Sequence, residues 1–129
     1  MPAAASLRIL IVDDQASIRS LIRAALHQIG LTEVAEASDG EEALRILLTR
    51  PVSLVISDFN MPKVNGLELL RAVRSHPPIS KVGFIMLTGS ADRELVQKAV
   101  QHGVNNLLVK PFTAASLKQK VEDVVGALA

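Results

Sequence analysis

The sequence contains no cysteine, no tryptophan and no tyrosine, and only three phenylalanines among its 129 residues. Without cysteine, disulfide bonds, thiolate chemistry and cysteine-based zinc sites are excluded. With so few aromatic residues, a core has to be built from aliphatic side chains. Hydrophobic residues make up 49% of the chain, which is ample for a folded core and argues against disorder.

The sequence also lacks a strong charge imbalance and long apolar runs. Fourteen basic residues face thirteen acidic ones, which gives a formal net charge of +1. Such a chain lacks the electrostatic footprint of a nucleic-acid-binding protein. No stretch approaches the roughly 18 consecutive apolar residues that span a bilayer, and the first residues do not resemble a signal peptide. We therefore expect a cytoplasmic protein with no direct nucleic acid partner and no membrane insertion.

What the sequence does contain is an alternation of short aliphatic runs with longer amphipathic segments. The runs are typical of buried parallel strands and span residues 7–12, 33–37, 54–57, 81–87 and 107–109. The second run is short and mixed, which suits an edge strand. The amphipathic segments predict helices at residues 16–29, after Asp39, at 66–75, at 93–102 and around 117–128. In the second helix we expect Ala43, Leu44, Leu47 and Leu48 to face inward.

Five strands that alternate with five helices predict an α/β fold of the (βα)5 type. Such chains form a doubly wound parallel sheet with right-handed crossovers and helices on both faces. A chain of 129 residues is expected to form one compact domain. We expect a short N-terminal tail at residues 1–6 and a single domain at residues 7–129.

Polar side chains follow four of the five predicted strands. Asp13 and Asp14 come after the first strand, Asp58 after the third, Thr88 after the fourth and Lys110 after the fifth. The carboxyl ends of the strands in an open parallel sheet lie along one edge, where ligands bind. We therefore expect these five residues to converge on one pocket.

Three carboxylates in one pocket repel each other, so the pocket needs either protonation or a bound cation. Oxygen ligands select a hard metal, and Mg2+ typically combines one or two carboxylates with waters and phosphate oxygens. The hydroxyl of Thr88 can donate to a phosphoryl oxygen, and the ammonium of Lys110 can neutralise its charge. With Asp58 as the nucleophile, this set suits phosphoryl transfer.

Each of these residues also has a simpler interpretation. The pair Asp13 and Asp14 could cap a helix and supply its acidic first turn. Asp58 could cap a loop, Thr88 could be an ordinary residue at a strand end, and Lys110 could be a solvated surface charge. Taken singly, these interpretations are at least as good. The joint placement at four strand ends is what favours the phosphoryl-transfer site.

The motifs at these strand ends resemble those of bacterial response regulator receiver domains, in particular the stand-alone, chemotaxis-type (CheY-like) members. The matching segments are residues 11–14 (IVDD), 57–62 (SDFNMP), 66–70 (GLELL), 87–89 (LTG) and 109–113 (VKPFT). The resemblance extends from residue 7 to residue 128 and keeps the family's motif order and spacing. It implies a flavodoxin-like fold with strand order 2-1-3-4-5 and a cis peptide bond before Pro111.

The resemblance also implies a role for each residue of the pocket. Asp58 accepts a phosphoryl group from a phosphohistidine on a histidine kinase or phosphotransfer protein. Mg2+ is held by Asp14, Asp58 and the backbone carbonyl of Asn60, while Asp13 acts mainly through water. The remaining pair, Thr88 and Lys110, contacts the phosphoryl group.

The partner surfaces follow from the same resemblance. The phosphodonor is expected to dock on the first helix through Gln15, Ile18 and Arg19. The output surface is expected on the fourth helix, fifth strand and fifth helix, including Gln97, Leu107 and Lys118. We expect a monomer or a weak dimer.

One residue departs from the family pattern. Leu107 stands where many relatives carry an aromatic side chain that moves inward when the threonine shifts toward the phosphoryl group. We expect the shift of Thr88 to persist here, together with repacking of Leu107. The alternative is that Leu107 is simply part of the core.

Three functions remain open at the level of sequence. The first is a signalling switch whose binding surface changes on phosphorylation; it is not an enzyme in the usual sense, although it assists its own phosphorylation and dephosphorylation. The second is a phosphate sink or relay without its own effector. The third is a hydrolase with an aspartyl intermediate, which would need a pocket for an organic substrate that a chain of this length without an insert hardly provides.

Overall fold

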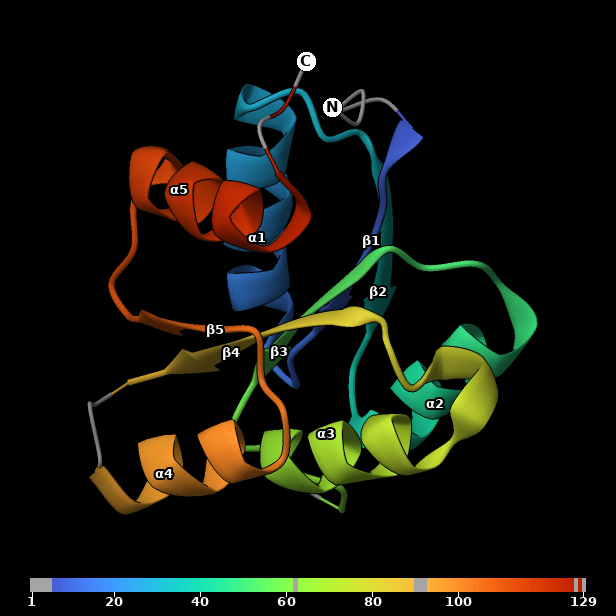
Figure 1. The fold of residues 1–129 in the computed structure, drawn as a ribbon. Coiled ribbons are helices and arrows are strands. Elements are labelled where there is room, and N and C mark those ends of the chain that lie inside the picture. Colours follow the sequence, from blue (N-terminus) through green and yellow to red (C-terminus); the bar gives the residue numbers. More distant parts are fainter. Residues whose placement is uncertain (1–5, 62, 90–92, 127, 129) are drawn as a thin grey trace.

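A computed structural model describes residues 6–61, 63–89, 93–126 and 128 of the chain (Figure 1). Five strands form one parallel sheet in the order β2-β1-β3-β4-β5, which confirms the predicted flavodoxin-like topology with β2 at one edge. The strands are β1 (Arg8–Val12), β2 (Glu33–Ala37), β3 (Leu54–Asp58), β4 (Gly83–Thr88) and β5 (Asn106–Val109).

Helices cover both faces of the sheet (Figure 1). They are α1 (Ala16–Gln28), α2 (Gly40–Thr49), α3 (Gly66–Ser75), α4 (Arg93–Gln101) and α5 (Ala114–Val125), with a short 3-10 helix η2 (Pro77–Ile79) before β4. On one face lie α1 and α5, and on the other lie α2, α3 and α4. The five-fold βα alternation predicted from the hydrophobic pattern is confirmed.

The core is split by the sheet into two aliphatic layers. Along β1, Ile9 and Ile11 pack with α1 and α5, while Leu10 and Val12 pack into the layer that holds the buried residues of α2 and α3. This alternation follows from the two-residue period of a strand. Because both faces of the central strands are covered, β3 is buried along its whole length, including its last residue, Asp58.

The ends of the helices follow signals that the sequence carries. The Asp39 side chain accepts a hydrogen bond from the backbone N–H of Glu42 and caps α2 as predicted. After α4, Gly103 adopts a φ of +86°, a backbone conformation that favours glycine. These two signals mark the start of α2 and the end of α4.

Three details of the predicted elements were wrong. Leu48 does not face inward but is 55% exposed, because it lies at the border of the helical stripe that buries Ala43 and Leu47. Strand β4 starts at Gly83 rather than at residue 81, since the N–H of Val82 donates to Ile79 in the preceding turn. Helix α5 ends at Val125, and Leu128 packs on the core from beyond that end.

Some predictions lie outside the described residues. These are the tail at residues 1–5 and the proline at position 62 of the motif after β3. Within the described residues, no helix is both long and apolar enough to cross a membrane.

Candidate functional site

The three aspartates meet at the carboxyl edge of the sheet. Asp58 ends β3, and Asp13 and Asp14 directly follow β1, which is the neighbour of β3 in the sheet. One ligand oxygen from each of the three side chains lies within 4.8 Å of the others. Asp13 and Asp58 are buried and Asp14 is exposed, so the pocket has a buried floor and one solvated wall.

Asp13 is held at three of its four polar atoms. Its N–H donates to the carbonyl of Ala37 at 3.1 Å, and its Oδ1 accepts from the N–H of Gln15 at 2.8 Å. Its carbonyl accepts from Nη1 of Arg19 at 2.5 Å. The residue that caps α1 is Gln15, so the helix-cap interpretation of the aspartate pair is not supported.

The fourth polar atom, Oδ2 of Asp13, is buried and accepts no hydrogen bond from any described residue. Burial raises the pKa of the Asp13 carboxyl, and the charges of Asp58 and Asp14 raise it further. The N–H of Gln15 and the ammonium of Lys110 act in the opposite direction. A buried carboxylate oxygen with this surplus of negative charge is a position where a cation is stabilised.

Lys110 supplies the nearest positive charge. Its Nζ lies 3.0 Å from Oδ1 of Asp58 and 3.9 Å from Oδ2 of Asp13. The Lys110–Pro111 peptide bond is cis, as the resemblance implied, and the N–H of Lys110 donates to the carbonyl of Thr88 at 2.8 Å. The side chain is 27% exposed, so the interpretation of Lys110 as a solvated surface charge is wrong.

Thr88 ends β4 next to this pocket. It is buried, and its neighbour Leu87 is paired in register with Asp58. Thr88 and Asn60 line one cavity of about 640 Å³ between the loops that follow β3 and β4. The structure therefore brings all the residues predicted for the pocket to the same edge of the sheet.

The donor set fits Mg2+. It consists of carboxylate oxygens, one of them buried and without a hydrogen bond from a described residue, and it includes no sulfur or imidazole ligand. Mg2+ prefers one or two carboxylates and completes its shell with waters and phosphate oxygens, for which exposed Asp14 leaves room. A lysine beside the carboxylates contributes a fixed charge that a metal ion would supplement.

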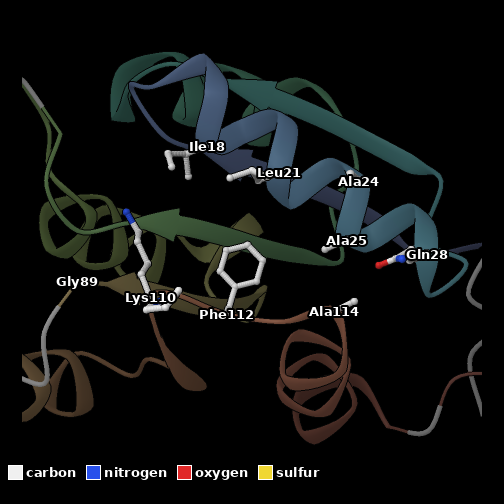
Figure 2. Close-up of a pocket in the computed structure, with 10 residues that line it drawn as sticks. Ile18, Leu21, Ala24, Ala25, Gln28, Gly89, Lys110, Phe112 and Ala114 are labelled. Atoms are coloured by element: carbon white, nitrogen blue, oxygen red, sulfur yellow. The ribbon is translucent and has the colours of Figure 1, made fainter.

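An apolar groove begins beside Lys110 and runs along α1 (Figure 2). It has a volume of about 520 Å³ and lies between α1 and the segment that leads from β5 into α5. Ile18 and Leu21 line its α1 side, and Phe112 faces them from the other segment. Sequence reasoning missed Leu21 and Phe112, because a leucine in an apolar helical run reads as a core residue, whereas Leu21 is 60% exposed.

Leu107 is partly buried on β5 and packs against the core layer that contains Phe84 and Met86. The packing agrees with the simpler interpretation of Leu107 as a core residue. The strand next to it, β4, ends at Thr88, and Met86 on that strand is paired in register with Leu107.

The comparisons with known proteins agree with this geometry. Residues 9–122 match the family model described as response regulator receiver domain. The chain is 48% identical to a probable chemotaxis protein CheY of Rhizobium etli over 99% of both chains, and 42% identical to the chemotaxis protein CheY of Pseudomonas aeruginosa over 92% of this chain and 95% of that one. A solved structure of Vibrio cholerae chemotaxis protein CheY4 superposes with a TM-score of 0.86 at 35% identity, covering 92% of this chain and 98% of the other.

The fold, the acidic pocket and these matches define the chain as a member of the response regulator receiver domain family. Within that family it is a CheY-like response regulator of two-component signalling.

Proposed function

We propose that this chain is a single-domain response regulator that accepts a phosphoryl group on Asp58 and thereby switches its binding surface. The observation that carries the proposal is the contact of 3.0 Å between Lys110 Nζ and Asp58 Oδ1 inside a cluster of three carboxylates. A buried carboxylate that is paired with a lysine and lies next to candidate metal ligands is placed for phosphoryl transfer rather than for stability alone.

The residues of the pocket divide the chemistry between them. A carboxylate oxygen of Asp58 attacks the phosphorus of a phosphohistidine, and the electron pair of the breaking P–N bond leaves with the imidazole. Asp14, Asp58 and the backbone carbonyl of Asn60 would hold Mg2+, with Asp13 acting through water, and the ion would supply charge neutralisation for the transferring oxygens. Hydrolysis reverses the state, because water attacks the phosphorus and regenerates the carboxylate.

Lys110 and Thr88 respond to the phosphoryl group once it is bound. The ammonium, already beside Asp58, pairs with a phosphoryl oxygen, and the hydroxyl of Thr88 donates to another. A threonine that moves toward the phosphoryl group leaves space in the layer against which Leu107 packs. In this way a charge added at one edge changes the face formed by α4, β5 and α5.

The phosphodonor docks on α1 at the groove beside the pocket. Gln15 and Ile18 lie at the pocket end of this helix, and exposed Leu21 continues the apolar surface. A helix of the donor protein that fills the groove places its phosphohistidine next to Lys110 and Asp58. Arg19 contributes the exposed edge of its side chain to the same surface.

The remaining features are those of a small regulatory domain. Residues 7–129 form one receiver domain that works in the cytoplasm as a monomer or weak dimer, without direct contact to nucleic acid and without membrane insertion. The downstream protein binds on the face that carries Gln97 and Lys118, where Val100 and Val109 add exposed apolar area. The chain assists its own phosphorylation and dephosphorylation but turns over no organic substrate.

Affinity capture separates the switch from a phosphate sink. The chain loaded with Mg2+ and beryllofluoride, which mimics a phosphoryl group, is immobilised beside the same chain carrying Asp58→Asn. A switch should retain a protein only in the loaded state, and Val109→Glu on the output face should abolish that retention. Equal retention by both samples would contradict a phosphorylation-controlled surface and favour the sink.

A further inference from the structure

The guanidinium of Arg19, near the start of α1, donates hydrogen bonds to two different residues. Its Nε donates to Oε1 of Glu36 on β2 at 3.0 Å, and its Nη1 donates to the carbonyl of Asp13 at 2.5 Å. One planar group therefore joins the edge strand to the residue that opens the acidic pocket.

Glu36 holds this guanidinium in place together with a second arginine. Nε of Arg23 donates to Oε2 of Glu36 at 2.7 Å, so each carboxylate oxygen has its own arginine. Burial raises the pKa of Glu36, but the hydrogen bonds from Arg23 and Arg19 outweigh burial and hold it below the usual 4.5. Glu36 is therefore ionised at neutral pH, and the clamp is intact there.

The contact with Asp13 matters because it helps to fix every polar atom of that residue except Oδ2. The N–H, the carbonyl and Oδ1 of Asp13 are each fixed by a hydrogen bond, to Ala37, Arg19 and Gln15 respectively. Only Oδ2 remains, buried and without a hydrogen bond from any described residue, on the side of Lys110. Removal of one anchor lets the peptide of Asp13 rotate, and the direction of Oδ2 rotates with it.

We propose that Arg19 is a positioning residue for the cation site: locked by Glu36, it holds the backbone of Asp13 so that Oδ2 faces the bound metal. The inference rests on the function proposed above and deepens it. It also changes the role expected for Arg19, whose polar atoms point inward and whose side chain is only 17% exposed. The two contacts use different nitrogens of one rigid guanidinium, whereas a lysine has a single nitrogen at the end of a flexible stem and cannot occupy both positions.

Arg23 provides a matched control. It lies one turn further along α1 and donates to the same carboxylate, but its other hydrogen bond goes to the carbonyl of Val34 at 3.3 Å and not to Asp13. Arg19→Gln and Arg23→Gln therefore remove the same charge and one hydrogen bond to Glu36 each. They differ in whether the backbone of Asp13 loses its anchor.

The test measures the affinity for Mg2+ alone, in a titration monitored by NMR of the backbone amides. The chain has no tryptophan or tyrosine that could report binding by fluorescence. Arg19→Gln should weaken Mg2+ binding about tenfold, the scale on which groups behind metal ligands act, whereas Arg23→Gln should stay within about twofold of the wild type. With acetyl phosphate as donor, the half-saturating Mg2+ concentration should rise in Arg19→Gln while the plateau rate at saturating Mg2+ is kept.

Arg19→Lys keeps the positive charge and disturbs the fold less. If Arg19→Gln does not fold, the Mg2+ affinity of Arg19→Lys is compared with that of the wild type instead. Arg19→Lys should lose Mg2+ affinity nearly as much as Arg19→Gln; wild-type affinity in Arg19→Lys would overturn positioning in favour of charge alone. Equal affinities in Arg19→Gln and Arg23→Gln would overturn the proposal as well. A wild type that forms no adduct on Asp58 would contradict the proposed function and would still leave the Mg2+ comparison readable.

Discussion

At the scale of single residues, the pocket is destabilised by repulsion among its carboxylates, and a bound cation relieves that repulsion. Asp13 is a buried carboxyl beside two others, and Lys110 offsets only part of the negative charge. Such a cluster is less stable empty than with a cation, so metal affinity and folding stability are linked. Metal affinity and stability are linked most directly at Oδ2 of Asp13, which is buried and accepts no hydrogen bond from a described residue.

The substitution Asp13→Asn tests that link through its pH dependence. Burial raises the pKa of Asp13 above its usual 3.8, so the native state holds the proton more tightly than the unfolded chain. Stability therefore falls as the pH rises from 3.8 through the raised value, and the loss persists at neutral pH. Without Mg2+, Asp13→Asn should be more stable than the wild type at neutral pH by about 1 kcal/mol, the usual scale of one substitution.

Urea unfolding followed by circular dichroism, in the presence of a chelator, measures this difference. The gain should shrink as the pH is lowered toward 3.8, since the wild type then takes up its proton. Mg2+ should stabilise the wild type more than the variant. A variant that is less stable than the wild type at neutral pH without Mg2+ would show that Asp13 is not under electrostatic strain.

Sequence reasoning identified the pocket residues because a parallel sheet places the carboxyl ends of its strands at one edge. That rule needs only the strand positions, which the aliphatic runs give. It could not identify the clamp of Arg19 and Glu36, because nothing in the spacing of two residues on a helix and an edge strand says where a long side chain extends. The exposure of Leu21 was hidden for a related reason, since the border of a buried helical stripe depends on what packs beside it.

At the scale of elements, the start of α3 is fitted closely against Asp58, the proposed phosphoacceptor. A Cβ added at Gly66, the first residue of α3, would collide with the carbonyl oxygen of Asp58 and lie 2.7 Å from Sδ of Met86. This position has room only for glycine. The first residue of α3 can therefore lie against the backbone of Asp58 only because it has no β-carbon.

Gly66→Ala should accordingly lower the free energy of unfolding by about 1–3 kcal/mol, the usual cost of overpacking. It should also slow phosphorylation by acetyl phosphate, because the backbone of Asp58 has to move. Chemical denaturation and intact mass at fixed times measure the two effects. Gly89→Ala is the control for stability, since a Cβ there meets no atom within 4 Å, and an equal loss of stability in both variants would contradict the steric account.

Helix α1 also carries the proposed docking surface, and two exposed leucines allow a matched test of it. Leu21 is 60% exposed in the groove beside the pocket, while Leu48 is 55% exposed on α2 and does not line that groove. Leu21→Glu should slow phosphotransfer from a phosphorylated histidine kinase or phosphotransfer protein about tenfold or more, since a charge in an apolar contact costs at least about 1.4 kcal/mol.

The same variant should react with acetyl phosphate at the wild-type rate, because a small donor needs no docking surface. Leu48→Glu should leave both reactions unchanged. Radiolabelled phosphotransfer time courses give the rates. If Leu21→Glu and Leu48→Glu slow transfer from the protein donor equally, the groove is not the docking site.

At the scale of the whole molecule, the acidic pocket and the proposed output face share one five-stranded fold, and the start of α4 lines the same cavity as Thr88. The sheet order was predictable from the resemblance, and the five-fold alternation was predictable from hydrophobic periodicity alone. The path of the signal was not predictable. Leu107 stands where many relatives carry an aromatic residue, and its packing is visible only in the structure. In the proposed switch, the path from Thr88 to the output face runs through the layer that contains Leu107, Phe84 and Met86.

The proposed function depends on Asp58 being the residue that is phosphorylated. Incubation with acetyl phosphate and Mg2+, followed by intact mass measurement, tests this most directly. The account predicts a single phosphoryl adduct on the wild type, a smaller fraction of adduct when Mg2+ is chelated, and none on Asp58→Asn. An undiminished adduct on Asp58→Asn would contradict the account, because the phosphoryl group would then reside on another residue.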